Sequence, residues 1–332
     1  MAKKRKKHNR GLKFFTTLLT ILIILVSLAL ITYNYTIEKF LSEINFTEID
    51  RESIGISDTA IKTAGVKTVL LLGTDSGDIE AGARSDTIIL ASVNTNLRTL
   101  KLISIPRDTK VDIKGYWPQK INHAYHFGGA ELMLHTINSN FDLAVDDYVV
   151  IDYAGVAKIV DAVGGIDLEL TQEEINFINS RYMAQTARDG KIKSGGVYLD
   201  AEPGMVHLNG IQAVTHARDR SSTALADFDR QTRQRNIIQA VIKKLDSKSL
   251  PEIMNISSTF LSTVGTSMPK DEILKYLTIF AMNKSEYIDN IKSYQNPSGE
   301  NGTGYRGIGK IYEFIPVIDK TIEMFNKYIN EE

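Results

Sequence analysis

Charged side chains stand at the two ends of the stretch RSDTIILASVNTNLRTLKLISIPRDT, which begins at Arg84. Two apolar runs, residues 87–93 and 100–105, are separated by the polar segment NTNLRT. Runs of this length and composition predict two antiparallel strands joined by a turn. Asp86 precedes the first run and Arg107 follows the second, so an acid and a base lie at the outer ends of the hairpin.

The expected register brings these two charges together. If Val93 pairs with Leu100 across the turn, Asp86 is the cross-strand neighbour of Arg107, with Cβ atoms ~4.5–5.5 Å apart. A slip of one residue would separate them. A surface ion pair at a sheet edge is one interpretation of this arrangement, and a binding site built on the strand ends is the other.

Further charged residues favour a site for a metal ion and phosphate. Asp75 follows the apolar run VKTVLLLG and could reach the same end of the sheet, and Arg84 and Asp108 flank it. Two carboxylates such as Asp75 and Asp86 suit Mg²⁺ or Mn²⁺, which bind a few protein carboxylates together with phosphate oxygens. Arginine side chains match the geometry of phosphate.

A second basic segment, THARDRSSTALADFDRQTRQRN, carries more side chains of the same type. Arg218 and Arg220 alternate, so an extended backbone would point both in the same direction. A helix is expected to follow, with Asp227, Arg230 and Gln234 on one polar stripe. A helix N-terminus favours an anion. A solvated amphipathic helix with loose arginines explains the stripe but not the concentration of arginines in these segments.

The sequence does not support a thiolate, zinc or serine catalytic site. The chain has no cysteine, which excludes a thiolate nucleophile and a cysteine zinc site. His123, His126 and His135 lack further ligands at the usual zinc spacing. A G-x-S-x-G serine motif is absent.

The elements that must position these residues are strands mixed with helices, which predicts one layered α/β domain. Strands are expected at residues 67–72, 87–93, 100–105, 146–152 and 166–170. Helices are expected at residues 153–163, 171–185, 209–217, 225–245, 253–264, 271–282 and 311–329, and the first and second of these are marked by a glycine stop and a capping box. Residues 294–307 are expected to form a long loop.

The N-terminus predicts a membrane anchor. Residues 1–13 contain seven Lys or Arg and no acid, and residues 14–33 form an uncharged apolar run long enough to span a bilayer. The positive-inside rule places the N-terminus in the cytoplasm and the remainder outside. A cleaved signal peptide is the alternative, but its apolar region would be shorter. Residues 34–65 are expected to be a stalk and 66–332 the extracytoplasmic domain.

Several motifs together resemble one family. RSDT, SIPRDT, KINHAY followed by GG, LNGIQAVTHARDR and DFDRQTRQ resemble, in order and spacing, motifs of the LytR–CpsA–Psr family of Gram-positive cell-wall enzymes. The resemblance is strong over residues 66–245 and loose beyond. Asp229 departs from it, because the family commonly has glycine at this position.

The resemblance implies a three-layer α-β-α fold with a mixed central sheet and an apolar pocket for a polyprenyl chain. It implies a membrane-bound phosphotransferase that moves an anionic glycopolymer, such as wall teichoic acid or capsular polysaccharide, from polyprenyl pyrophosphate to peptidoglycan. By motif match, Asp75 and Asp86 would hold Mg²⁺. Arg107, Asp108 and Asp86 would act in catalysis, and Asp75, Asp86 and Asp108 are open candidates for accepting the hydroxyl proton. The pyrophosphate would be bound by Arg84, Arg107, Arg218, Arg220, Arg230 and Gln234, with Lys120 at the mouth of the pocket.

Two other functions stay open. The domain could be a polyprenyl-pyrophosphate pyrophosphatase with water as the acceptor, or a non-catalytic lipid- or glycan-binding regulator of the cell envelope. Nucleic acid is not an expected partner, because only the short N-terminal tail has an excess of basic residues and the rest of the chain carries 32 Lys or Arg against 40 Asp or Glu. Trp117, in the segment KGYWPQK, is expected either on a loop near the lipid or glycan or in a packing position.

Overall fold

The computed structural model of the chain forms two compact units, Met1–Ile44 and Asn45–Glu332. It describes residues 38, 42, 44–74, 83–192, 198–220, 222, 227–306 and 312–330. The predicted membrane span and the basic tail before it lie outside the described residues. Within the part that is described, no helix is both long and apolar enough to cross a membrane.

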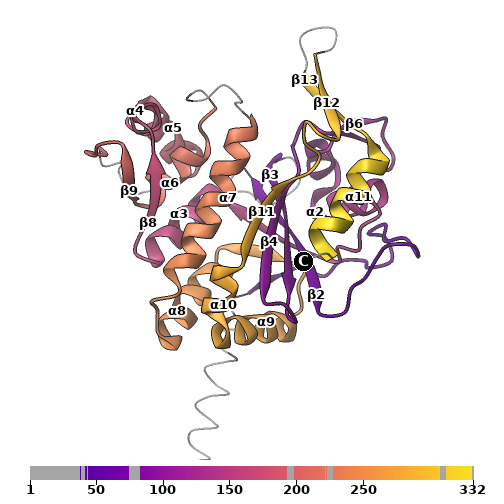
Figure 1. Cartoon of the computed structure of the whole chain (residues 1–332), viewed down its shortest axis with the longest axis horizontal. Helices are drawn as coiled ribbons and strands as arrows, with labels where there is room; N and C mark the ends of the chain where they lie inside the picture. The colour runs from indigo at the N-terminus through magenta and orange to yellow at the C-terminus, as the bar shows by residue number, and fades with distance from the viewer. Residues whose placement is uncertain are drawn as a thin grey trace, which may run out of the picture. The chain divides into compact units, whose positions relative to one another are not determined.

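A seven-stranded mixed sheet lies at the centre of the second unit (Figure 1). Parallel and antiparallel neighbours alternate irregularly: β2 is parallel to β7 and antiparallel to β3, and β11 is parallel to β4. This confirms the expected mixed α/β fold. In spatial order the strands are β1 (Asn45–Phe46), β10 (Val264–Thr266), β7 (Asp147–Asp152), β2 (Val66–Thr74), β3 (Ser85–Asn94), β4 (Thr99–Ser104) and β11 (Ile291–Gln295).

The hairpin of β3 and β4 has the predicted register. Val93 pairs with Leu100. The turn is shorter than expected, because Asn94 pairs with Thr99 and leaves four residues between the strands. The Asn94 side chain accepts hydrogen bonds from the backbone N–H groups of residues 96 and 97, an Asx-type arrangement that stabilises a tight turn.

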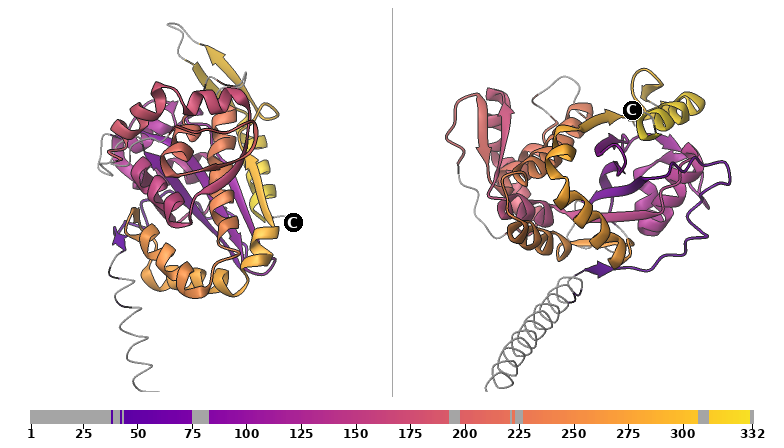
Figure 2. Two further views of the ribbon diagram at one scale, coloured as in Figure 1. Left: turned by 90° about the vertical axis from the view of Figure 1, so that its left-hand side faces the viewer. Right: turned by 60° about the horizontal axis from the view of Figure 1, so that its bottom comes forward.

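Helices cover both faces of the sheet. On one face, α2 and α11 enclose a core that includes Leu70, Leu90 and Phe325. On the other face lie α3, α7, α8, α9 and α10. In the right-hand view of Figure 2 the orange helices and the yellow helix α11 lie on opposite sides of the strands. The bounds are α2 (Asn122–Phe141), α11 (Ile318–Asn330), α3 (Tyr153–Ala162), α7 (Asp227–Lys244), α8 (Leu250–Leu261), α9 (Lys270–Met282) and α10 (Lys284–Asp289).

Smaller elements complete the domain. A second core lies between α3, α6, α7 and the ribbon of β8 and β9, and α4 and α5 follow β8 in the chain. The ribbons β5–β6 and β12–β13 lie near the end of the sheet opposite α9 (Figure 1). Their bounds are β8 (Ile166–Leu170), β9 (Gly204–Leu208), α4 (Gln172–Ile178), α5 (Arg181–Asp189), α6 (Gly210–Ala217), β5 (Lys110–Val111), β6 (Gln119–Lys120), β12 (Gly302–Arg306) and β13 (Tyr312–Pro316).

Three local predictions were wrong. The expected helix at residues 171–185 is two helices, because Ser180 accepts a hydrogen bond from the Tyr182 N–H and so caps a new helix. The expected helix at 311–329 begins with strand β13, which ends at Pro316. That strand pairs with β12, which lies within the expected loop.

The structure also extends the domain beyond its expected start. In the segment expected to be a stalk, β1 joins the central sheet. Ile54 is 1% exposed and belongs to the main core. Helix α2 begins at Asn122, within the KINHAY motif, and was not among the predicted helices.

Candidate functional site

Asp86 lies at the centre of a cluster of arginine side chains. Its Oδ1 atom is 2.5 Å from Arg107 Nη1, which confirms that the register brings these two residues together. Its Oδ2 atom is 3.5 Å from Arg220 Nη2 and 3.7 Å from Arg230 Nη1. Arg230 Nη2 also donates a hydrogen bond to the Asp86 carbonyl oxygen. Three guanidinium groups around one carboxylate leave an excess of positive charge, which suits a multiply charged anion.

Separate elements supply the members of this cluster. Strand β3 begins at Ser85, and Asp86 lies at a register shift where it has no pairing partner on β2. Arg107 follows the end of β4. Arg220 lies after α6, and Arg230 projects from the first turns of α7 with a side chain only 4% exposed. The site therefore forms only when the hairpin and both helices are assembled.

Lys120 and Asp108 extend the charged region. Lys120 Nζ is 2.6 Å from Asp108 Oδ1, and Arg107 Nε is 3.7 Å from the other carboxylate oxygen of Asp108. The structure thus links these residues to Asp86 in one ion-pair network.

Arg84 lies on the same side of the site and is exposed. Burial lowers the pKa of His123, and the positive charges of Arg84, Lys120 and His126 lower it further. Arg84, Lys120 and His126 therefore each lie within electrostatic reach of His123, and the negative charge of Asp108 opposes their effect.

Arg218 does not lie in an extended segment, so that part of the prediction was wrong. Helix α6 continues to Ala217 and Arg218 is its C-cap in a helical conformation, not part of an extended segment. The Arg218 guanidinium is 2.6 Å from Asp189 and 3.1 Å from Thr186, and it lies over the Tyr153 ring. Arg218 thereby joins the end of α6 to α5.

A buried ion-pair network supports the loop that carries Arg220. Arg233 Nε donates to Glu174 at 2.8 Å, and Arg233 Nη1 donates to the Asp219 carbonyl oxygen. Glu174 also completes the predicted capping box with Thr171 at the start of α4. Because Asp219 directly precedes Arg220, Arg233 holds the backbone of that loop against α7.

His216 lies in the same buried region, between α6 and this network. Burial lowers its pKa to about 4, and the positive charge of Arg233 contributes to the effect, while Glu174 and Asp219 oppose it. Nδ1 of His216 has no hydrogen-bond partner among the described residues. His216 is therefore neutral at pH 7.

Arg235, two residues after Arg233 on α7, reaches the central sheet. It donates hydrogen bonds to the hydroxyl groups of Ser293, Ser104 and Thr232. Burial lowers its pKa to about 10. The sequence did not single out Arg233 or Arg235, since their partners are distant in the chain. Gln234 projects between them, and its Oε1 atom is buried without a hydrogen-bond partner in the described part of the structure.

The carboxylate of Asp86 is a hard oxygen donor and fits a divalent cation that also binds phosphate. The second expected ligand, Asp75, lies outside the described residues. Among the residues described, no group of three or more His, Asp or Glu could hold a metal ion without further ligands.

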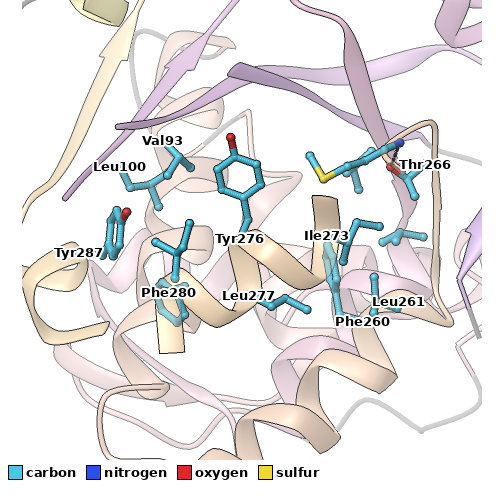
Figure 3. Close-up of a pocket in the computed structure, with 14 residues that line it drawn as sticks. Val93, Leu100, Phe260, Leu261, Thr266, Ile273, Tyr276, Leu277, Phe280 and Tyr287 are labelled. Carbon is cyan, nitrogen blue, oxygen red and sulfur yellow. Dashed lines mark hydrogen bonds between the residues drawn. The ribbon is translucent and has the colours of Figure 1, made fainter. Parts of the chain in front are cut away.

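An apolar pocket of about 240 Å³ lies on the face of the sheet covered by α7 to α10. Figure 3 shows Tyr276 projecting from α9 towards the strands, where Val93 and Leu100 form one wall. Val93 is seven residues from Asp86 along β3, so the pocket lies roughly 23 Å from the charged cluster. The lining residues are Val93, Leu100, Val149, Phe260, Leu261, Val264, Thr266, Met268, Ile273, Tyr276, Leu277, Ile279, Phe280 and Tyr287.

An apolar strip on the sheet connects these two regions. Residues 71, 91, 149 and 151 are apolar, share the pocket's face through strand alternation and pairing, and are only partly buried. Their neighbours on the opposite face, such as Leu70 and Leu90, are completely buried. On the pocket's own face Ile89 and Leu102 are also completely buried, so the looser cover is confined to the strip.

The fold and the site define an α/β protein with an anion site at one end of its sheet and an apolar pocket on one face. Residues 32–313 match the model of the LytR_cpsA_psr family, and the chain belongs to this family.

Two kinds of relative support this assignment. The chain is 31% identical over 274 residues to a Bacillus cereus protein named polyisoprenyl-teichoic acid–peptidoglycan teichoic acid transferase TagU, covering 80% of this chain and 79% of the relative. Among solved structures it resembles protein gbs0355 from Streptococcus agalactiae, with 26% identity, a TM-score of 0.65, and coverage of 80% and 89%. It shares the fold of YwtF (TagT) with bound octaprenyl pyrophosphate lipid, with 21% identity, a TM-score of 0.60, and coverage of 85% and 99%.

Proposed function

We propose that this protein is a membrane-anchored phosphotransferase. It moves an anionic glycopolymer, such as wall teichoic acid or capsular polysaccharide, from a polyprenyl-pyrophosphate carrier to the 6-hydroxyl of muramic acid in peptidoglycan. Residues 14–33 form the single membrane span, with the N-terminus in the cytoplasm and the catalytic domain outside. The names of the relatives support this proposal.

The observation that carries the proposal is the joining of a cationic cluster to an apolar strip on one sheet. A polyprenyl pyrophosphate has a charged head and a long apolar tail, and the two regions match these parts in order. The head would lie among Arg107, Arg220 and Arg230, and the tail would run along the strip to the pocket. The bound lipid in the YwtF structure is a molecule of the same class.

The reaction breaks one phosphoanhydride bond and forms one phosphodiester bond. The acceptor hydroxyl oxygen attacks the phosphorus that carries the glycan, polyprenyl phosphate leaves, and the hydroxyl proton passes to a base. Arg107, Arg220 and Arg230 would orient the pyrophosphate and neutralise charge on its oxygens as the leaving group departs. Asp86 and Asp75 would hold Mg²⁺, which supplies further charge neutralisation.

The proposal is tested with the purified full-length protein, a polyprenyl-pyrophosphate glycan, Mg²⁺ and a peptidoglycan oligomer. Mass spectrometry follows the release of polyprenyl phosphate and the attachment of glycan. Arg107→Ala should lower the rate about a hundredfold or more, the usual effect of losing one preorganised donor to a developing charge. Arg98→Ala is the matched control, because Arg98 forms an ion pair with Glu286 at the opposite end of the same hairpin.

Each outcome identifies a different function. Glycan attached to peptidoglycan, lost in Arg107→Ala and kept in Arg98→Ala, supports the transferase and its site. Polyprenyl phosphate released without glycan attachment indicates a pyrophosphatase and overturns the transferase. Lipid binding without turnover overturns both and leaves a non-catalytic binding protein.

A further inference from the structure

We propose that Trp117 forms a sugar-binding subsite, on which the face of a pyranose ring of the glycan substrate stacks. The inference rests on the proposed function, because it assigns a surface to the carbohydrate part of that reaction. It names a residue outside the anion site and outside the apolar pocket.

Trp117 is the most conspicuous exposed aromatic side chain near the site. It is 76% exposed, and its neighbour Tyr116 is 45% exposed. An indole of this size is normally at least partly covered in a folded protein. Its exposure beside a charged site therefore indicates a surface that another molecule covers.

The backbone that carries Trp117 is held in one conformation. The Tyr116 N–H donates to the Ile113 carbonyl oxygen, and Gly115 between them has the positive φ of 83° that this tight turn requires. The Tyr116 ring stacks on Phe127 of α2, with ring centroids 4.0 Å apart. Ile113 is buried in the main core. The indole is thus presented on a preformed platform.

The platform is close to the charged cluster. Trp117 is three residues before Lys120, so the two backbones are at most about 10 Å apart. Lys120 contacts Asp108, which is connected through Arg107 to Asp86. The turn with Trp117 is thus joined to the cluster by a short stretch of chain and this chain of ion pairs, and a glycan that extends from the cluster can reach the indole.

The position of the platform relative to the sheet favours a sugar over a lipid. Tyr116, which directly precedes Trp117, stacks on α2, and α2 covers one face of the sheet, whereas the apolar pocket lies under α8 and α9 on the other face. The proposed pyrophosphate site is at the strand ends, between the face covered by α2 and the face with the apolar pocket. A lipid tail that follows the apolar strip leaves the site away from Trp117, so the group at the other end of the pyrophosphate, or the acceptor, faces the indole.

The chemistry of the surroundings also fits a carbohydrate. The axial C–H groups of a pyranose are weakly positive and stack on the electron-rich face of an indole, while its hydroxyl groups need polar neighbours. The exposed side chains of Asp112, Lys114 and His126 surround the platform on the loop and on α2. An apolar face with a polar rim is the usual composition of such a subsite.

Fluorescence tests the proposal directly, because Trp117 is the only tryptophan of the chain. The full-length protein in phospholipid nanodiscs is titrated with soluble peptidoglycan oligosaccharides, and separately with the polyprenyl-pyrophosphate glycan. We expect a saturable blue shift of the emission and protection from acrylamide quenching with at least one of them. In a parallel experiment the nanodisc contains brominated phospholipid, and quenching of the Trp117 fluorescence by this lipid reports contact with the membrane.

Quenching by brominated lipid without any response to saccharide would overturn the proposal and indicate that Trp117 contacts the membrane. An absence of both responses would also overturn it. This readout needs no turnover, so it can succeed where the phosphotransferase assay fails, and the two proposals fail independently.

Kinetics then distinguish the source of the sugar. Trp117→Ala should raise KM about tenfold with little change in kcat, the expected effect of losing one stacking contact, and Trp117→Phe should restore most of the loss. A rise in the acceptor KM assigns the platform to peptidoglycan, and a rise in the donor KM assigns it to the carried glycan. Tyr198→Ala removes a comparably exposed aromatic side chain from another part of the surface and is the control. Equal effects of Trp117→Ala and Tyr198→Ala would overturn the proposal.

Discussion

Replacing Glu174 by glutamine tests the charge of the buried Glu174–Arg233 ion pair, which supports the loop that carries Arg220. Glutamine keeps the shape of the side chain and can still accept the Thr171 N–H in the capping box. What it removes is the negative charge beside Arg233, whose side chain is only 5% exposed. A buried charge left without its partner is strongly destabilising.

The size of the effect follows from the contacts that remain. Breaking a buried pair costs about 3–5 kcal/mol. Arg233 keeps a hydrogen bond to the Asp219 carbonyl oxygen and a 3.9 Å approach to its carboxylate. We therefore expect Glu174→Gln to lower the free energy of unfolding by about 3 kcal/mol, the lower end of that range. For a domain of this size the melting temperature should fall by roughly 5 °C.

The assay is urea unfolding of the two proteins followed by circular dichroism, with Glu252→Gln as the control. Glu252 forms the same capping box with Ser249 at the start of α8, but on the surface. We expect this variant to leave the unfolding midpoint unchanged within error. If the two substitutions had equal effects, the capping box rather than the buried charge would be the source of stability, and the reasoning would be refuted.

The pH dependence gives an independent check. Burial alone would raise the pKa of Glu174, but the hydrogen bonds from Thr171 and Arg233 hold it below its usual value. A lowered carboxyl pKa contributes stability above the usual pKa, and that contribution is lost as the pH falls through the lowered value. The difference between the wild type and Glu174→Gln should therefore shrink on acidification.

Three further predictions concern neighbouring parts of the domain. His216, with its pKa lowered to about 4, should make the wild type less stable as the pH falls from 6.5 towards 4, because the unfolded chain takes up the proton first; His216→Asn should flatten urea midpoints measured across this range. Val149→Phe places a larger side chain in the apolar pocket and should weaken the binding of long polyprenyl pyrophosphates in calorimetry while leaving farnesyl diphosphate unaffected. Asp189→Asn removes the charged partner of Arg218 and should raise donor affinity, because the released guanidinium can turn to the pyrophosphate. An unchanged affinity would show that Arg218 serves only to join α6 and α5.

Local patterns were sufficient to predict the hairpin and its charged end. Alternation of side chains fixes the register wherever one face is buried, and that is why the Asp86–Arg107 contact could be predicted from the pairing of Val93 with Leu100. The capping box at Thr171 and the bounds of α6 and α7 were predictable for the same reason, since their signals lie within a few residues.

Contacts between distant segments could not be predicted in this way. Strand β11 pairs in parallel with β4, which lies nearly two hundred residues earlier in the chain, and no local sequence pattern predicts this pairing. The backbone conformation of Arg218 depends on where α6 ends, and its partners Asp189 and Tyr153 are distant in the chain. The pocket needs side chains from α8, α9 and α10 on one sheet face, so its shape exists only in the assembled domain.

Helix α7 has a consequence for the order in which the domain folds. Its inward side chains include three buried arginines, and each contacts a different element: Arg230 contacts β3, Arg233 contacts α4, and Arg235 contacts β4 and β11. Charged side chains cannot enter an interior before their partners are in place. Helix α7 must therefore dock late, after the sheet and α4 have formed, so a partly folded chain exposes no working arginine cluster and the anion site becomes functional only as folding is completed.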